Sequence, residues 1–372
     1  MKKKLFFLIC ALLFNFQVYA IPNPFIYEDQ LIQLKKIATT DYYCLYTSNG
    51  TAVAEKTEAG YYLPIKVKHV VKDLEKKIKK LKKKYNKTKN VALKKRYKKQ
   101  IKGVNKTLSS INTCKNFNVA KLACKIFAGK NLKSRNLMVL NGTKCSNQKQ
   151  SVVAMISMNY KTKKGIETAI CTGTYIGEKA FLTAAHCFDD SDFLATGKTL
   201  ISVDVEVAGK TYKAKRWERN PSWNKEDEVG DTALVFIGRE LNKTPFKLVG
   251  KKYVPQEGEL VALVGYGNVK YIDKKREVDG YYGGFLTIAS VEESGLLAVY
   301  DSHSKQATIC YGDSGGPLVT YIDGAWRILG TASNGDDDEC GYFTGVQKAY
   351  WSRVNSPENV LFLEMFLPGI FD

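Results

Sequence analysis

Apolar residues recur at helical spacing in two stretches of the first third of the chain. The first run steps by three and four residues from Val67 to Tyr85, and the second does so from Leu93 to Ile111. This spacing places the apolar side chains on one face of an α-helix. The polar residues 86–90 separate the two runs and would turn the chain. The pattern therefore predicts a small helical domain, an antiparallel hairpin with an apolar seam.

From about residue 139 the pattern becomes that of a β-protein. Short runs of Val, Ile, Leu, Tyr and Thr are separated by Gly, Asn and Asp turns, as expected for antiparallel strands. A closing helix is expected after Ser356 and Pro357, which form a favourable helix start. Residues 21–64 are mixed in character, and we assign no chemistry to them.

Positive charge is concentrated on the predicted hairpin. The chain has 372 residues and a formal net charge of +20, and residues 66–106 hold eighteen lysines and Arg96 against Asp73 and Glu75, a net charge of +17. The outer surface of the hairpin is therefore predicted to consist mainly of lysine. This surface is either simply solvated or binds nucleic acid, anionic lipid or acidic protein. No groove-reading motif or aromatic stacking set accompanies the lysines, which argues against nucleic acid.

The amino terminus has the three parts of a secretory signal peptide. Three lysines precede an apolar run at 5–16, and the small residue Ala20 follows it. The run is too short to span a bilayer stably, and no other segment is long and apolar enough, so we expect no transmembrane segment. We therefore expect a secreted or periplasmic protein with a signal peptide at 1–20, a Lys-rich helical-hairpin pro-region or accessory domain at 21–138, and a β-domain at 139–372.

Cysteine usage predicts disulfides. Eight cysteines remain once the signal peptide is removed, an even number in a chain expected outside the cytoplasm. They are scattered, with no pair at metal-ligand spacing and no suitably placed histidine, so no metal is expected. The hairpin brings its two ends together, so Cys44 can meet Cys114 or Cys124, and the remaining one is left for Cys145. Four cysteines allow three pairings, among which sequence cannot choose.

Residues 310–318 carry a candidate nucleophile, Ser314, flanked by Asp313 and by glycines. A serine hydroxyl attacks poorly unless a base takes its proton, and the oxyanion that then forms needs N–H donors already in place. Gly312 and Gly315 leave the backbone bare, so the amides of Gly312 and Ser314 can point into one anion-binding concavity. Without partner residues the same stretch would be only a tight turn.

Candidate partners for this serine lie earlier in the chain. Of the three histidines, His186 ends a strand-like run of apolar and small residues, whereas His69 lies beside the seam of the predicted hairpin and is expected to be structural. Asp231 stands at the mouth of an apolar strand, where a lone acid would usually be a turn residue. In the order His186, Asp231, Ser314, the three resemble the catalytic triad of the chymotrypsin/trypsin family of serine proteases.

The resemblance covers roughly the last 230 residues. Besides the triad it rests on residues 139–143, 154–158, 171–176, 220–224, 265–267 and 350–354. It implies an all-β catalytic domain of two six-stranded antiparallel β-barrels with a cleft between them, preceded here by the small α-helical hairpin domain. It also implies a protein or peptide substrate and no cofactor.

In the roles that the resemblance implies, Ser314 attacks a peptide carbonyl, His186 accepts and later returns the proton, and Asp231 fixes the imidazole tautomer. The amides of Gly312 and Ser314 stabilise the oxyanion. The resemblance further implies two disulfides, Cys171 with Cys187 beside the histidine and Cys310 with Cys340 beside the specificity pocket.

The floor of that pocket falls at Thr308, whose neutral hydroxyl favours uncharged substrate side chains. Ser333 corresponds to the serine that supports the aspartate, and the strand continuing to Gly335 is the one against which substrate backbone pairs. Asn334 stands where the family usually has tryptophan. Four acids at 336–339 should rim the pocket, either attracting basic substrates or forming a solvated loop.

The resemblance also implies a zymogen. Val139 matches the terminus that the family releases, and Asp313 occupies the position of the carboxylate that receives the new α-amino group. The cut then falls after Met138, with Lys133 and Arg135 as alternative sites.

Two roles are open for the lysine-rich region 21–138. It is either an inhibitory pro-domain that docks over the cleft onto the acids at 336–339, or an anion- or surface-binding module. If binding were the function of the whole chain, the protein would be an anion- or surface-binding protein that uses the protease fold as a scaffold.

Overall fold

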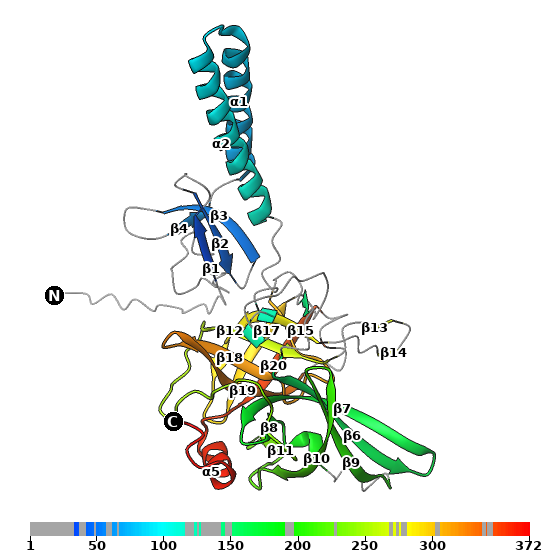
Figure 1. The fold of residues 1–372 in the computed structure, drawn as a ribbon. Coiled ribbons are helices and arrows are strands. Elements are labelled where there is room, and N and C mark those ends of the chain that lie inside the picture. The colour runs from blue at the N-terminus through cyan, green and yellow to red at the C-terminus, as the bar shows by residue number, and fades with distance from the viewer. Residues whose placement is uncertain are drawn as a thin grey trace, which may run out of the picture.

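The computed structural model has an amino-terminal module and two larger β-structures, with the helical hairpin standing out at one end (Figure 1). The hairpin lies beside a small sheet, and the β-structures form the other end. The structure describes residues 33–36, 42–47, 50–56, 62–64, 67–115, 123–124, 126–127, 143–145, 151–189, 197–226, 229–267, 271–272, 275–276, 281–301, 306–336, 340 and 345–372.

A four-stranded antiparallel sheet precedes the hairpin, in the order β1-β2-β3-β4. Its strands are β1 Gln33–Lys36, β2 Tyr42–Thr47, β3 Gly50–Lys56 and β4 Tyr62–Pro64. No helix or strand is predicted for this region from the sequence. The tyrosines and Val53 of β2 and β3 are typical strand residues, but the strands are too short for a clear alternation.

The predicted hairpin is present, formed by α1 Val67–Lys87 and α2 Val91–Lys115. Asn90 caps the second helix, because its side-chain oxygen accepts a hydrogen bond of 3.0 Å from the amide of Leu93. Among the described residues α1 has no buried side chain, so the seam alone holds most of the hairpin together. At its base Ile111 and Cys114 are buried, and a disulfide joins Cys114 to Cys44 of β2.

The first β-structure is a closed six-stranded barrel in the order β10-β11-β8-β7-β6-β9. Ile156, Phe181, Val205 and Val235 fill its core. Its strands are β6 Val153–Thr162, β7 Gly165–Gly177, β8 Ala180–Thr183, β9 Thr199–Val207, β10 Lys210–Arg219 and β11 Ala233–Ile237.

The second β-structure is a curled sheet of eight strands in the order β16-β17-β20-β19-β18-β12-β15-β5. The two-barrel fold class is confirmed: six strands in the order β17-β20-β19-β18-β12-β15 form the main part of this half, and two-residue strands extend it at both edges. The short strands β5 and β16 pair onto the outer edges of β15 and β17 and lengthen the sheet. Its strands are β5 Thr143–Lys144, β12 Leu260–Gly265, β15 Tyr282–Thr287, β16 Ser290–Val291, β17 Gly295–Asp301, β18 Pro317–Ile322, β19 Ala325–Gly335 and β20 Val346–Arg353.

Two small elements complete the fold. The strands β13 Tyr271–Ile272 and β14 Lys275–Arg276 form a separate pair. The expected closing helix is α5 Pro357–Phe366, and the hydroxyl of Ser356 caps it by accepting from the amide of Asn359. None of the described helices is long and apolar enough to cross a membrane.

A second disulfide attaches the amino-terminal module to the curled sheet. Cys124 is bonded to Cys145, whose amide donates a 2.9 Å hydrogen bond to the carbonyl of Tyr281, just before β15. Beside it, the ring of Phe127 stacks on that of Phe246 with centroids 5.4 Å apart. The module is therefore fixed to the β-domain by covalent linkage as well as by apolar packing.

Candidate active site

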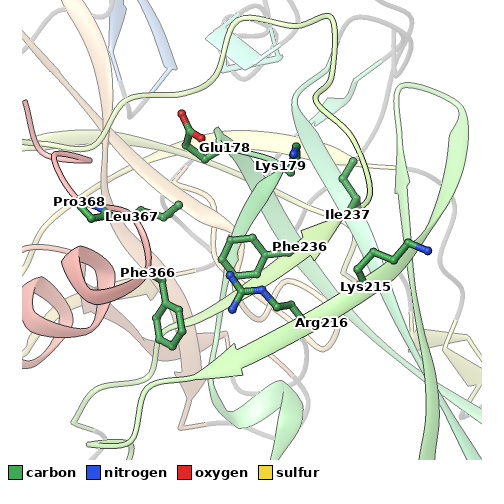
Figure 2. A pocket seen from close by; sticks show the side chains of 9 residues that line it. All are labelled: Glu178, Lys179, Lys215, Arg216, Phe236, Ile237, Phe366, Leu367 and Pro368. Carbon is green, nitrogen blue, oxygen red and sulfur yellow. The ribbon is translucent and has the colours of Figure 1, made fainter.

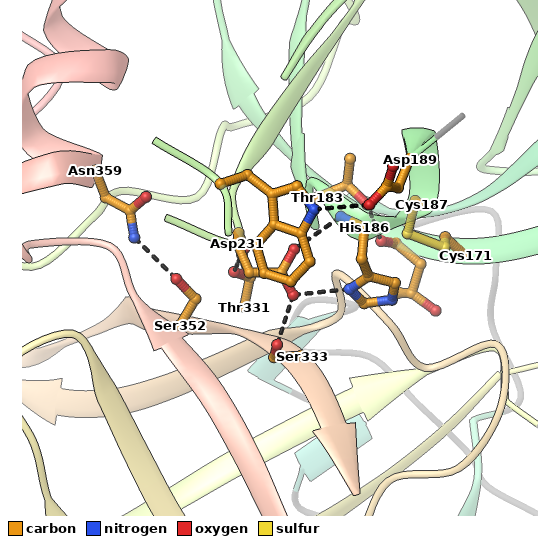
Figure 3. Close-up of polar contacts among 12 residues, drawn as sticks. Cys171, Thr183, His186, Cys187, Asp189, Asp231, Thr331, Ser333, Ser352 and Asn359 are labelled. Atoms are coloured by element: carbon orange, nitrogen blue, oxygen red, sulfur yellow. Dashed lines mark hydrogen bonds and ion pairs between the residues drawn. A yellow bond between two sulfur atoms is a disulfide. The ribbon is translucent and has the colours of Figure 1, made fainter. Parts of the chain in front are cut away.

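Strand pairing brings His186 and Asp231 together. β8 leads into a 3₁₀ turn, η3 His186–Phe188, and β11 starts two residues after Asp231. Because β8 and β11 are antiparallel neighbours with Thr183 opposite Ala233, the end of one strand lies beside the start of the other. The backbone amide of His186 donates to Asp231 Oδ1 over 2.9 Å, and His186 Nδ1 lies 2.7 Å from Asp231 Oδ2 (Figure 3).

Asp231 is fully buried and ionised. Burial alone raises the pKa of a carboxyl, but the charge and hydrogen bonds of His186, with the hydroxyl of Ser333 at 2.5 Å, outweigh it and hold the pKa of Asp231 below its usual range. An ionised carboxylate only accepts hydrogen bonds, so His186 carries its proton on Nδ1 toward Asp231. The nitrogen Nε2 is then the basic one.

Ser333 and Thr331 reach this acid from β19 of the other half of the domain. Ser333 donates to the Asp231 carboxylate, as the resemblance implied, and the hydroxyl of Thr331 donates to the Asp231 carbonyl over 3.2 Å (Figure 3). The indole of Trp223 lies beside the imidazole of His186 with ring centroids 6.2 Å apart. Neither Trp223 nor Thr331 is predicted as a site residue from the sequence.

Ser314 is held against the segment that carries His186. Its carbonyl accepts a 2.8 Å hydrogen bond from the amide of Thr172 on β7. Gly315, next in the chain, has φ +77°, and a side chain there would overlap Thr183 and the backbone of Ala184. Only glycine lets the two backbone segments come this close. The contact places Ser314 near the end of β8, just before the turn that begins at His186.

The backbone around Ser314 carries two available donors. Gly312 has φ +97°, and its carbonyl accepts a 2.7 Å hydrogen bond from the Thr172 hydroxyl. Within the described part of the chain, the amides of Gly312 and Ser314 donate to no protein acceptor. Both N–H groups are thus available to an oxyanion.

Asp313, between these two residues, is a second buried carboxylate with a different environment. Its oxygens accept from the amides of Gly267 at 2.7 Å and Cys310 at 2.9 Å, and no cation in the described ranges pairs with it. Burial, opposed only by these two hydrogen bonds, raises the pKa of Asp313 to about 7. The expected partner Val139 and the cut at Met138 lie outside the described residues.

The expected pocket floor is neutral and is completed by a residue that the sequence analysis missed. Thr308 is buried, and its hydroxyl donates a 2.8 Å hydrogen bond to the side-chain oxygen of the buried Gln347 on β20. A side chain at Gly335 would overlap the Gln347 amide, so these three residues lie together. In the sequence Gln347 is only a polar residue in a strand-like run, and such a residue usually points outward.

The acids expected at the rim are only partly described. Asp336 is exposed and its carboxylate accepts a 2.6 Å hydrogen bond from the amide of Lys348, while 337–339 and His303 lie outside the described residues. His69 lies exposed on α1.

The cysteines beside the site pair as the resemblance implied, Cys171 with Cys187 and Cys310 with Cys340. Cys171, Cys187 and His186 lie close enough to hold a metal ion. However, the two sulfurs are bonded to each other, so neither is a thiolate ligand.

A separate hollow of about 480 Å³ lies away from these residues, between the outer side of the first barrel and the end of α5 (Figure 2). Arg216 lies over the ring of Phe236 at 4.0 Å and near that of Phe366 at 5.6 Å. Arg216 is already paired with Glu218 at 3.0 Å. The hollow shares no residue with the candidate active site.

Comparison with known proteins identifies the family. The trypsin family profile matches residues 139–351. The venom peptide isomerase heavy chain of Agelenopsis aperta is 27% identical over 227 residues, 54% of this chain and 91% of that protein. Phenoloxidase-activating enzyme 1 of Spodoptera litura is 25% identical over 235 residues, 52% of this chain, and trypsin 5G1 of Aedes aegypti is 27% identical over 169 residues, 40% of this chain.

This chain spans 60% of the length of each of the last two proteins. The profile match itself covers more than half of this chain and contains His186, Asp231 and Ser314. The chain therefore belongs to the trypsin family of serine endopeptidases.

Proposed function

We propose that this endopeptidase cleaves peptide bonds through a triad of His186, Asp231 and Ser314. The observation that carries the proposal is the buried Asp231 carboxylate, which accepts from both His186 and Ser333. It supports the role of Asp231 in orienting the imidazole, with Nε2 as the base.

The chemistry follows from these positions. His186 Nε2 takes the proton of Ser314 as Oγ attacks the substrate carbonyl, and the amides of Gly312 and Ser314 stabilise the oxyanion. The imidazolium is stabilised by Asp231 and then protonates the leaving amine. A water molecule, activated by the same imidazole, hydrolyses the acyl-enzyme and restores Ser314.

The substrate is a protein or peptide with an uncharged side chain at the cleaved position. The Thr308 hydroxyl donates to Gln347, so these two residues give the expected floor neutral dipoles and not a carboxylate. Burying lysine or arginine there without a counter-charge costs free energy. Apolar or medium-sized neutral side chains avoid this cost.

The protein is made as a secreted or periplasmic zymogen. The signal-peptide pattern at 1–20 and four disulfides support export. Asp313 is buried without a cation among the described residues, which supports a role as receptor for the α-amino group of Val139 after a cut at Met138. The new ion pair would then order the segment that holds Gly312 and Ser314.

The lysine-rich region serves as an accessory binding module in this proposal. The hairpin stands away from the two β-structures (Figure 1), which favours this role over docking across the cleft. Inhibition by 21–138 stays a prediction of the sequence, and a binding protein that merely uses the protease fold as a scaffold is the alternative function.

Replacing Ser314 by Ala should lower kcat by about 10⁶-fold, the loss typical of a removed triad nucleophile. Peptide hydrolysis by the cut protein is the measurement, with the exposed Ser222→Ala as control. If Ser314→Ala kept wild-type turnover, the proposed mechanism would be wrong. The alternative function, a binding protein that uses the protease fold as a scaffold, would then be favoured.

Thr308→Asp should place a carboxylate at the pocket floor and raise kcat/KM for Arg and Lys substrates at least about tenfold, or 1.4 kcal/mol. A peptide-library profile measures the change, with Thr308→Ser as the matched control. Cleavage confined to Arg and Lys in the wild-type protein would contradict the neutral pocket.

The uncut protein should lose stability as pH rises from about 4 to about 7. An unfolded Asp has a pKa of about 3.9, whereas that of buried Asp313 is about 7. The native state therefore binds more protons in this window, and unfolding becomes easier toward higher pH by up to about 1.4 kcal/mol per pH unit. Asp313→Asn should remove this slope.

Urea unfolding of the uncut protein between pH 4 and pH 8 tests this, with Asp323→Asn in an exposed turn as control. The slope should also shrink in the cut protein, where the α-amino group pairs with the acid. An equal slope in wild type and Asp313→Asn would show that Asp313 does not carry the effect.

Salt separates the two roles of the hairpin. Docking of lysines over the cleft weakens as the Debye length falls from about 10 Å at 0.1 M to about 3 Å at 1 M, so it predicts that activity of the cut protein rises with salt. We expect no rise in turnover of a neutral peptide over this range. A rise that disappears when Asp336 is replaced by Ser would instead support inhibition.

A further inference from the structure

The two helices carry charge of one sign at very high density. Residues 67–115 contain eighteen lysines and Arg96 against Asp73 and Glu75. Helices of 21 and 25 residues are about 30–40 Å long at about 1.5 Å per residue. The net charge of +17 therefore corresponds to about one charge per 2 Å, close to the one per 1.7 Å of duplex DNA.

Solvation alone does not account for this composition. Among the described residues the only ion pair within the hairpin joins Lys76 to Asp73, at 3.6 Å. Lysines repeat at four-residue spacing along α1, as in Lys72, Lys76 and Lys80, and each like-charged pair at this spacing destabilises a helix by about 0.2–0.5 kcal/mol. A merely solvated face would be more stable with alternating signs. The lysines therefore act against helix stability unless an anion neutralises them.

The lysines surround the hairpin rather than forming one face. Half-buried apolar side chains of both helices, such as Leu81 and Ile101, form the seam, and at about 3.6 residues per turn the lysines take most of the remaining directions. All lysines of α1 are exposed. A planar membrane would contact only one side of such a rod, whereas a linear polymer can lie along any side.

The hairpin is anchored at its base and not along its length. Val67, Val70, Val71 and Leu74 pack against the main core cluster, and Cys114 is tied to β2 by its disulfide. Beyond this base, the hairpin extends away from the two β-structures (Figure 1). The rod is thus presented to a partner outside the molecule.

The anchor also survives the proposed activation. The disulfide from Cys124 to Cys145 encloses residues 125–144 of the sequence, which include the expected cut after Met138. Cutting the chain there leaves the hairpin covalently attached to the catalytic domain. Any surface bound by the hairpin therefore retains the active enzyme.

We propose that the hairpin of α1 and α2 binds a linear anionic polysaccharide bearing sulfate or carboxylate groups, and so fixes the protease to a polysaccharide-coated surface. Lysine outnumbers arginine eighteen to one here, so recognition is by point charges and not by planar, bidentate pairing. The aromatic side chains of the hairpin, Tyr85 and Tyr97, are half-buried, and Lys94 lies over the Tyr85 ring at 5.8 Å, so the hairpin has no fully exposed aromatic stacking set for nucleic acid bases.

The test uses the full-length protein, uncut and cut, with a sulfated polysaccharide, a polyuronate and neutral dextran as probes. Vesicles of anionic and neutral phospholipid and single-stranded DNA are the competing partners. The hairpin variant combines Lys72→Gln, Lys76→Gln, Lys79→Gln and Lys83→Gln. Its matched control combines Lys161→Gln, Lys164→Gln, Lys210→Gln and Lys252→Gln, all exposed on the β-domain.

The wild-type protein should bind at least one charged polysaccharide and not dextran, with a dissociation constant that weakens about 100-fold from 50 to 200 mM salt if about five charges are neutralised. The hairpin variant should bind at least tenfold more weakly and with a smaller salt slope, while the control variant binds as wild type. Comparison of the sulfated polymer with the polyuronate shows which anion is preferred. Hydrolysis of a small neutral peptide should be equal in all three proteins.

Cut protein should be retained on the polysaccharide with its peptidase activity, and only reduction of the disulfides in the presence of denaturant, which also removes the apolar packing, should release the catalytic chain. Circular dichroism at 222 nm should show that the hairpin variant keeps its helices, because removing like charges favours them. Equal weakening in the control variant, or tighter binding to vesicles or DNA than to either polysaccharide, would overturn the proposal. The binding readout does not depend on catalysis, so it stands even if the proposed triad fails.

Discussion

The buried carboxylate of Asp231 is the constraint on which the candidate active site depends. A carboxylate removed from water costs several kcal/mol unless donors replace its hydration. Here the donors come from two halves of the domain, His186 at the end of β8 and Ser333 on β19. The need to satisfy one acid therefore joins the closed barrel to the curled sheet at the same place where it orients the imidazole.

Asp313 is also buried, but its pKa is shifted in the opposite direction from that of Asp231. Asp231 faces a histidine and a hydroxyl, and its pKa falls. Asp313 has two backbone amides and no cation among the described residues, and its pKa rises to about 7. The difference lies in the partners and not in the burial, so Asp313 is the acid that gains most from an arriving amino group. The proposed cut would supply the α-amino group of Val139 as a cationic partner for Asp313. Asp313 would then have a nitrogen donor beside its carboxylate, as Asp231 already has in His186.

Local periodicity predicted the helical hairpin, because its seam repeats within each helix and needs no information from elsewhere in the chain. The nature of the domain at 139–372 was recognised because residues around His186, Asp231 and Ser314 resemble family motifs. The sheet of β1 to β4 was missed because short strands depend on neighbours far along the chain. The disulfide from Cys44 to Cys114 was undecided for the same reason, since β2 places Cys44 at the hairpin base. Gln347 was missed because its partner Thr308 is 39 residues away, and a polar strand residue alone indicates an outward position.

The positive charge of the molecule is segregated into one part, which fits the separate tasks proposed for the hairpin and the β-domain. The chain outside residues 66–106 carries a net charge of only +3, because +17 of the +20 lies within them. The hairpin extends away from the two β-structures (Figure 1), and exposed charges farther apart than about 8 Å are largely screened at physiological salt. Its outer lysines should therefore exert little force on a substrate in the proposed neutral pocket. In the proposed attachment their influence on catalysis is positional, because a tethered enzyme meets substrates on the same surface at an effective concentration of about millimolar. In this proposal, specificity for the peptide bond and attachment to the surface can change independently. The disulfides Cys44–Cys114 and Cys124–Cys145 fix where the hairpin lies but do not bring its charges to the active site.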